Sequence, residues 1–319
     1  MPRWGEILKE LKDYEKESPF DFIRRKYLKK LEQHTKRNTI LYASNWTQTK
    51  NVPSELISIT DEDVEGFMEA ASGLSGNLDL IIHSPGGSGG VTEALVTYLR
   101  SKFNHIRVII PYAAMSAATM LACSGDEIVM GAHSFIGPID PQIVVYNKNL
   151  GVQLIPAQAI IDQFNRAKKE CIENPKNVGV WLPILEQYGP ALIIQCEEAI
   201  KLSEELVEKW LRTYMFRNNE EAKKKSDEVA KKLSNHSMFL SHGRRIGRDQ
   251  AKEFGLEIRD LEDDPVFQDL VLSVFYSTTL TFDATPAVKI IENHLGQAFI
   301  KQFRQIPIRA VPSKTPKSE

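Results

Sequence analysis

A glycine-rich turn and a serine further along the chain are the positions of this sequence best suited to acyl-transfer chemistry. The segment IIHSPGGSGG, residues 81–90, places four glycines between an apolar run and an amphipathic stretch. Glycine allows backbone amides to approach a ligand closely, and amides at the start of a helix point toward negative charge. We therefore expect residues 84–90 to form a pocket that stabilises an oxyanion.

A glycine-rich turn between a strand and a helix also suits phosphates and dinucleotides. The neighbouring residues must therefore distinguish these ligands from an oxyanion. Gly90 is followed by Val91 rather than by the lysine of a Walker motif. The next apolar run ends in Ile110 and Pro111, without the acidic residue that binds a ribose in dinucleotide-binding folds. Both features favour an oxyanion pocket. His83, which ends the strand before the turn, either packs beneath the glycines or lines the pocket.

The second chemical position is Ser116, near the start of MSAATMLACS, residues 115–124. These residues are small or apolar on every side, which is typical of a fully buried helix. At the start of such a helix the dipole stabilises a developing alkoxide, and Ala117 offers its backbone N–H. Two interpretations of Ser116 stay open: a nucleophile and an ordinary N-cap serine.

The elements that position these residues alternate between strands and helices. Strands are predicted at residues 39–43, 78–83, 107–111 and 127–130, with a helix over residues 91–103 between the second and third. A strand–helix–strand unit of this length implies a parallel sheet with right-handed crossovers. Further helices are predicted at residues 60–71, 157–171, 181–188, 191–214 and 219–233.

Composition and charge narrow the class of protein. The 319 residues carry a formal net charge of -2 and the sequence pI is near 6.4, which disfavours a nucleic-acid partner. The three cysteines form no CxxC pair and fall in apolar or helical stretches, as buried thiols of a reducing compartment do. No secretory signal and no apolar run long enough to span a membrane is present. We expect a soluble cytoplasmic protein without a transmembrane segment, a cofactor or a metal site.

The order of these motifs carries a resemblance. SPGG followed by a helix, then AMSAATML, a strand and the turn SFIGPIDPQ resembles the Clp-type serine peptidase superfamily, which includes signal peptide peptidase A and the crotonases. The stretches WLPILEQYGPALI, FLSHG and KIIENHLG make residues 20–300 similar to the serine dehydrogenase proteinase family, a Clp-like group. The resemblance implies an α/β fold with a Clp protease/crotonase-like parallel-sheet spiral core, an N-terminal helical arm and additional helices.

We expect four segments. They are an N-terminal helical arm at residues 1–36, a Clp/crotonase-like domain at 37–262, a C-terminal helical oligomerisation segment at 263–310 and a polar disordered tail at 311–319. Relatives assemble into rings or stacked oligomers, so a homo-oligomer is implied. Its contacts are expected in the arm and in residues 266–300, because their apolar stripes exceed what one sheet can cover.

The resemblance also implies roles for individual residues. Ser116 occupies the nucleophile position, the amides of Gly87 and Ala117 form the oxyanion hole, and Gly86 shapes the turn. The implied substrate is a peptide or an unfolded protein.

The general base is where this sequence departs from its relatives. A serine nucleophile needs a base within hydrogen-bond reach. Ile139 and Asp140 occupy the position of the Clp histidine, and residues 156–158 occupy that of the lysine in membrane-associated Ser-Lys relatives. Neither position holds a base, so the base must come from elsewhere in the chain.

Three residues are candidates for this base. Lys168 has the spacing seen in bacterial signal peptide peptidases, although Lys169 beside it indicates an exposed helix face. His236 and His242 flank a predicted strand, MFLS, which resembles the segment that bears the Clp aspartate. His236 or Ser237 aligns with that aspartate, whereas His242 would lie about 10 Å or more beyond it at the usual rise of a strand, so His236 is favoured. Asp140 either orients the base or is only a turn residue.

Three functions are compatible with this pattern. The favoured one is a serine peptidase with Ser116 as nucleophile. A crotonase-like enzyme acting on acyl thioesters would use the same amide pocket for an enolate, but it needs a carboxylate base and a nucleotide-binding surface. A chain without a base would be a binding or scaffold protein that keeps the fold without turnover.

Overall fold

The centre of the protein is a seven-stranded sheet within residues 4–48, 52–147 and 151–304, the part of the chain that this computed structural model describes. Its strands in chain order are β1 (Asn38–Ser44), β2 (Gly76–His83), β3 (Phe103–Ile110), β5 (Glu127–Met130), β10 (Ile258–Asp260), β11 (Ala287–Asn293) and β12 (Ala298–Gln302). Their spatial order is β10-β5-β3-β2-β1-β11-β12. The strands from β10 to β1 run parallel, β11 is antiparallel to β1, and β12 is antiparallel to β11. The predicted α/β class with a largely parallel sheet is confirmed.

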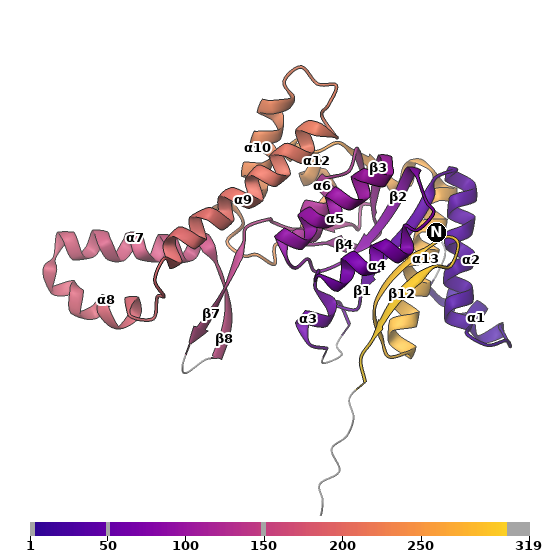
Figure 1. Ribbon diagram of the computed structural model, residues 1–319, viewed down its shortest axis with the longest axis horizontal. Helices are drawn as coiled ribbons and strands as arrows, with labels where there is room; N and C mark the ends of the chain where they lie inside the picture. The colour runs from indigo at the N-terminus through magenta and orange to yellow at the C-terminus, as the bar shows by residue number, and fades with distance from the viewer. Residues whose placement is uncertain (1–3, 49–51, 148–150, 305–319) are drawn as a thin grey trace, which may run out of the picture.

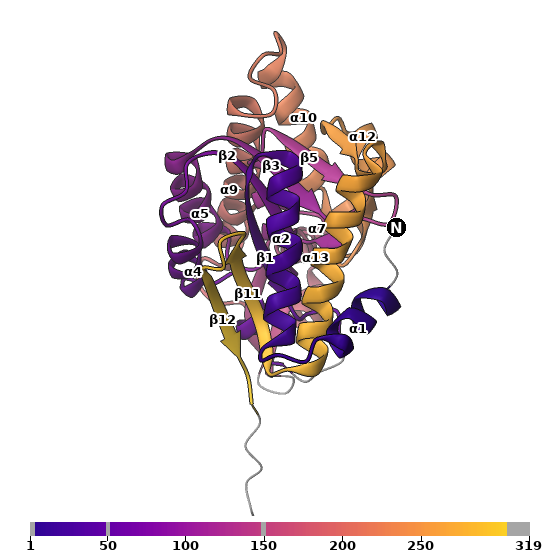
Figure 2. The same cartoon turned by 90° about the vertical axis from the view of Figure 1, so that its right-hand side faces the viewer.

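Helices cover both faces of this sheet, which explains why its strands carry apolar residues on both sides. The helices on the side of one face are α4 (Glu62–Ala70), α5 (Gly89–Lys102), α6 (Ala117–Cys123), α9 (Leu192–Thr213), α10 (Ala222–Ser234) and α12 (Arg248–Phe254). The opposite face is covered by α2 (Pro19–Thr35) and α13 (Pro265–Ala284). Figure 2 shows α2 and α13 side by side across the sheet. Successive residues of a strand therefore enter different cores, Ile82 the first and Ile81 the second.

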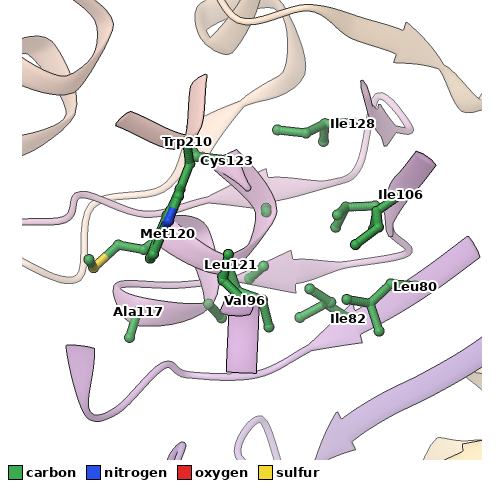
Figure 3. Packing of buried hydrophobic residues seen from close by; sticks show 14 of the residues in the cluster. Leu80, Ile82, Val96, Ile106, Ala117, Met120, Leu121, Cys123, Ile128 and Trp210 are labelled. Carbon is green, nitrogen blue, oxygen red and sulfur yellow. The ribbon is translucent and has the colours of Figure 1, made fainter. Parts of the chain in front are cut away.

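Helix α6, which follows Ser116, lies inside the first core. All seven of its residues are buried, as the sequence predicts. Figure 3 shows Leu121 and Cys123 of this helix packed among the sheet residues Ile82 and Ile128 and the ring of Trp210 from α9. Burial raises the pKa of the Cys123 thiol to about 12. Close packing of this kind gives the start of α6 a fixed position in the core.

The N-terminal arm predicted at residues 1–36 is helical in its described part. Helix α1 (Trp4–Asp13) packs against α2 and α13, and α2 packs along α13. Arg24 of α2 forms a fully buried ion pair with Glu292 of β11. The arm is thus part of the body: Ile7, Leu11 and Ile23 of its apolar stripe are buried within one chain, whereas Trp4 and Phe22 are 40% and 48% exposed.

The C-terminal segment predicted as helical, residues 263–310, is only partly so. Helix α13 agrees with the prediction, but β11 and β12 are strands of the central sheet, so the helical prediction is wrong there. The reason is burial on alternate sides: Ile290 enters the core beneath α13, whereas Ile291 enters the core beside α4. The buried apolar residues of α13 pack against α2 and the sheet, whereas Val266 and Leu295 of this segment are 56% and 67% exposed. The predicted disordered tail, residues 311–319, lies outside the described residues.

A two-stranded ribbon and a helical extension project from the body (Figure 1). The ribbon pairs β7 (Gln142–Asn147) with β8 (Gly151–Pro156), and the extension contains α7 (Ala157–Glu173), the 3₁₀ turn η1 (Pro175–Asn177), α8 (Val178–Leu185) and the first part of α9. The sequence patterns predict these helices but not the ribbon. One ribbon face packs on α7 and α9. The other face consists of the cross-strand pairs Val144–Leu154 and Tyr146–Val152, whose residues are between 64% and 72% exposed.

Short elements complete the surroundings of Ser116. They are α3 (Ser54–Ile57), β4 (Ala113–Ala114), β6 (Phe135–Ile136), α11 (His236–Phe239), β9 (Ile246–Gly247) and the 3₁₀ turn η2 (Leu261–Asp263). The strand predicted for MFLS is wrong, because Met238 and Phe239 belong to α11 and Leu240 and Ser241 are not in a strand. The side chain of Asn235 caps α11 by accepting a hydrogen bond from Met238 N–H, and Leu240 ends it with a φ of 60°. None of the helices in the described ranges has the length and hydrophobicity needed to cross a bilayer.

Candidate active site

Ser116 lies between β4 and α6 in an unusual backbone conformation. Its φ is 53° and its ψ is -123°, a combination that residues with a side chain rarely adopt. The hydroxyl makes no capping hydrogen bond to α6, so the N-cap interpretation does not hold. Strain of about 1–3 kcal/mol at a single polar residue is typical of sites where the backbone fixes a functional side chain.

The turn that carries Ser116 is tied to the end of β2. The N–H of Met115 donates to the carbonyl of Ser84 at 3.0 Å, and the N–H of Ser84 donates to the carbonyl of Ala113 at 3.2 Å. Within the turn, Oγ1 of Thr119 donates to the carbonyl of Ala114 at 2.8 Å. These bonds bring Ser116 next to the glycine turn, because Ser84 leads directly into Pro85 and Gly86.

Gly86 lies directly against Ser116. A Cβ atom added at Gly86 would lie 2.5 Å from the carbonyl oxygen of Met115, 2.8 Å from the nitrogen of Ala117 and 2.8 Å from Cβ of Ser116. The φ of Gly86 is 95°, which residues with a side chain rarely adopt. The two predicted chemical positions therefore converge, and the convergence requires glycine.

The peptide between Gly86 and Gly87 has a fixed orientation. The N–H of Ile59 donates to the carbonyl of Gly86 at 2.7 Å, and the N–H of Ser88 donates to the carbonyl of Ile59 at 3.0 Å. In a trans peptide the C=O and N–H point in opposite directions, so the N–H of Gly87 points away from Ile59. Within the described residues, neither this N–H nor that of Ala117 has an acceptor. Two free donors thus flank Ser116.

A cavity of about 630 Å³ opens in front of these donors. Ser116, Ala117, the glycine turn and His242 lie on one part of its wall. The remaining wall is mostly apolar and comes from α6, the GPIDPQ turn, the ribbon and α9. Its apolar side chains are Met120, Ile139, Val144, Leu154, Ala199, Leu202 and Leu206.

Asp140 connects the two candidate histidines. Its carboxylate is nearly fully buried, with Oδ1 2.7 Å from Nδ1 of His242 and Oδ2 2.9 Å from Nδ1 of His236. Of the two histidines, His242 lines the cavity that contains Ser116, and His236 does not. A carboxylate on Nδ1 of an imidazole leaves Nε2 available to accept a proton, which is how a base is oriented in a catalytic triad.

Lys168 and His83 lie away from this cavity. Lys168 is exposed on α7, where it lines a shallow depression with Lys169 and Ile172. His83 is fully buried and packs beside the rings of Trp46 and Phe275, so it supports the sheet end rather than lining the pocket. Burial lowers the pKa of His83 to about 4.

A second, larger groove of about 800 Å³ runs along α2. It shares no lining residue with the cavity of Ser116. Two of its cations are already paired, Arg25 with Glu292 and Lys26 with Glu10. The groove therefore has no connection to the chemistry at Ser116.

Two contributions to the site escape sequence reasoning. The ribbon is not predicted above, although it supplies Val144 and Leu154 to the cavity wall. The β-branched run that follows GPIDPQ is the signal that could have indicated its first strand. Ile59 fixes the Gly86–Gly87 peptide from a distant part of the chain. No local pattern marks Ile59, because its role depends on a tertiary contact.

Comparison with known proteins identifies the family of this chain. A sequence model of the ClpP-like SDH-type serine proteinases matches residues 21–274. Two uncharacterized proteins of Methanocaldococcus jannaschii are similar: MJ1495 is 30% identical over 202 residues, 63% of this chain, and MJ0137 is 38% identical over 90 residues, 28% of this chain. The alignments cover 59% and 32% of those relatives' own lengths, respectively. On the extent of the family match and the largely parallel α/β fold, this chain belongs to the ClpP-like SDH-type serine proteinase family.

Proposed function

We propose that this protein is a serine peptidase with Ser116 as nucleophile, His242 as general base and Asp140 as the residue that orients the base. The observation that carries the proposal is the convergence of Ser116, the glycine turn and His242 on one cavity. Asp140 supports it because its contact with Nδ1 of His242 leaves Nε2 free to accept a proton.

In the proposed reaction, Oγ of Ser116 forms a bond to the carbonyl carbon of a peptide while its proton passes to Nε2 of His242. The carbonyl oxygen becomes an oxyanion that accepts hydrogen bonds from the N–H groups of Gly87 and Ala117. When the C–N bond breaks, the imidazolium gives its proton to the leaving amine. Water then hydrolyses the acyl-enzyme by the same route and releases the carboxylic acid.

His236 has a supporting role in this proposal. It does not line the cavity, and its Nδ1 lies 2.9 Å from the second oxygen of Asp140. A carboxylate held at both oxygens keeps a fixed plane, and that plane determines the orientation of the His242 imidazole. This assignment reverses the preference for His236 that the sequence indicates.

The cavity wall favours apolar substrate side chains. Among the described residues that line it, none carries a carboxylate, ammonium or guanidinium group. An apolar side chain placed against Leu154, Leu202 and Leu206 gains roughly 25 cal/mol per Å² buried, whereas a charged one loses hydration without finding a partner. We infer an unfolded peptide substrate with an apolar residue beside the scissile bond.

The proposal includes assembly with further copies of this chain. The exposed ribbon face formed by Val144, Tyr146, Val152 and Leu154 is apolar on every member, and Val144 and Leu154 also line the cavity. An apolar surface of this kind is typical of a site that another chain covers. A second copy seated on it would narrow the entrance and restrict access to unfolded segments.

The acyl-thioester alternative has weaker support. It requires a carboxylate base facing the pocket, but the carboxylate nearest the site, that of Asp140, has both oxygens in contact with histidines. The other alternative, a binding or scaffold protein without catalytic turnover, is distinguished from the peptidase by the following experiment.

The experiment is covalent labelling with a fluorophosphonate followed by mass mapping of the modified peptide. We expect modification at Ser116 and none in the Ser116→Ala variant. Ser203→Ala is a matched control, because Ser203 lines the same cavity but donates its hydroxyl proton to the carbonyl of Ile200. A folded protein that is not labelled and does not cleave peptides with an apolar residue would contradict the peptidase and favour the scaffold.

A further inference from the structure

An unusual buried charge lies behind the glycine turn. Lys289 of β11 has no exposed side-chain surface, and Asp63 of α4 has none either. Nζ of Lys289 donates to both carboxylate oxygens of Asp63, at 2.7 and 2.9 Å, and to the carbonyl of Ser58 at 2.7 Å. The ammonium group of Lys289 has three N–H donors, and these three acceptors match that number.

The carboxylate of Asp63 also has several partners. It accepts a hydrogen bond from the hydroxyl of Tyr42 at 2.9 Å and one from the N–H of Thr60 at 3.0 Å. A buried ion pair is weak evidence for stability, because apolar residues of similar volume often replace such a pair without loss. The arrangement therefore calls for a local explanation, and that explanation lies in what the pair holds.

The pair holds the segment between α3 and α4. Lys289 contacts the carbonyl of Ser58, and Asp63 contacts the N–H of Thr60, so the backbone is fixed on both sides of Ile59. Ile59 in turn bonds to Gly86 and to Ser88, one bond on each side of Gly87.

The backbones of Gly87 and Ile59 are also in close van der Waals contact. A Cβ atom at Gly87 would lie 2.4 Å from the nitrogen of Ile59 and 2.5 Å from its oxygen. The backbones of Ile59 and Gly87 therefore move together. A shift of Ile59 would rotate the Gly86–Gly87 peptide and turn the N–H of Gly87 away from the cavity.

We propose that Lys289 and Asp63 form a clamp that orients the N–H of Gly87 for oxyanion binding, acting through Ser58, Thr60 and Ile59. Lys289 and Asp63 are positioning residues, because neither lines the cavity. The catalytic consequence rests on the proposed peptidase function, whereas the structural consequence does not depend on it.

The test compares two double variants, each of which replaces one buried ion pair of β11 with uncharged residues. Asp63→Asn with Lys289→Met removes the clamp without leaving a lone buried charge. Arg24→Met with Glu292→Gln is the matched control, because Arg24 and Glu292 are also fully buried but lie toward α2 and contact no residue of the glycine turn.

Two readouts are measured on the full chain. The first is the rate of fluorophosphonate labelling at Ser116 together with kcat and KM for an apolar peptide. Because loss of one oxyanion donor costs about 10²–10³ in kcat and the clamp only misaligns it, we expect the clamp variant to lose about 10- to 100-fold in labelling rate and kcat. KM should stay unchanged, since the apolar wall is untouched, and the control variant should keep the wild-type values.

The second readout is amide hydrogen exchange at Ile59 and Ser88, the donors that join the two segments. We expect faster exchange at both amides in the clamp variant and wild-type exchange in the control. Equal exchange in the two variants overturns the clamp, as does a clamp variant that keeps the wild-type labelling rate. If wild-type protein is not labelled at all, the peptidase fails, and the exchange comparison alone then supports or overturns the clamp.

Discussion

Nδ1 of His242 lies 2.7 Å from Oδ1 of Asp140. The resemblance described above implies that Ile139 and Asp140 stand where Clp-type peptidases carry histidine, and that His242 follows the segment resembling the one that carries their aspartate. In the proposed triad, acid and base have therefore exchanged places along the chain. A triad is recognised by geometry and roles rather than by sequence order, so the exchange is compatible with the same chemistry.

Replacing the two histidines separately tests this assignment. General acid–base catalysis contributes about 10²–10⁴ in rate, so His242→Asn should lower kcat for an apolar peptide by that factor. His236→Asn should have a clearly smaller effect, because it removes only one contact to Asp140. Thermal unfolding of both variants controls for folding. A larger loss with His236→Asn than with His242→Asn would contradict the assignment.

Glycine substitutions in the same turn test the oxyanion pocket. Gly87→Ala places a methyl group 2.4 Å from the backbone nitrogen of Ile59, so the turn must shift and the N–H of Gly87 with it. We expect a loss of about 10²–10³ in kcat. Gly89→Ala is the control, because a Cβ there meets nothing within 4 Å. Equal steady-state rates for the two variants would exclude Gly87 as an oxyanion donor.

The buried histidine makes stability depend on pH. Burial lowers the pKa of His83 to about 4 in the folded protein, against 6.5 for an ordinary histidine. Between these values the unfolded chain binds a proton that the folded chain does not, so stability falls as pH drops from 6.5 to 4. A pKa difference of this size corresponds to about 3 kcal/mol in the free energy of unfolding. Urea unfolding at several pH values should show this slope, and His83→Phe, which suits the neighbouring rings, should flatten it.

The exposed ribbon face predicts the oligomeric state. Val152→Glu places a charge on that face and should reduce the molar mass in solution to that of one chain. Leu295→Glu is the control, because Leu295 is 67% exposed in the turn between β11 and β12, outside the ribbon. Light scattering after size-exclusion chromatography gives the masses. A wild-type protein that is already monomeric at micromolar concentration would remove the basis for this surface.

Local patterns predict the parts of the site that are local. An apolar run followed by four glycines predicts the end of β2 and the start of α5, and small residues on all sides predict the buried α6. Contacts across the chain are not predictable in this way. The positions of His236 and His242 around Asp140 depend on the helical turn α11, where the sequence predicts a strand. The ion pair of Lys289 with Asp63 joins residues that are far apart in the sequence. Strand β11 resembles a helix in sequence because both of its faces are buried.

Strand β11 carries a buried cation and a buried anion three positions apart, Lys289 toward Asp63 and Glu292 toward Arg24. A slip of one residue in pairing would send every side chain to the other face. Lys289 would then point to the side of α2 and lose Asp63, and Glu292 would point to the side of α4 and lose Arg24, so both charges would be buried without their partners. The two buried ion pairs therefore select a single register of β11 beside β1. Any other pairing of this strand would bury uncompensated charge.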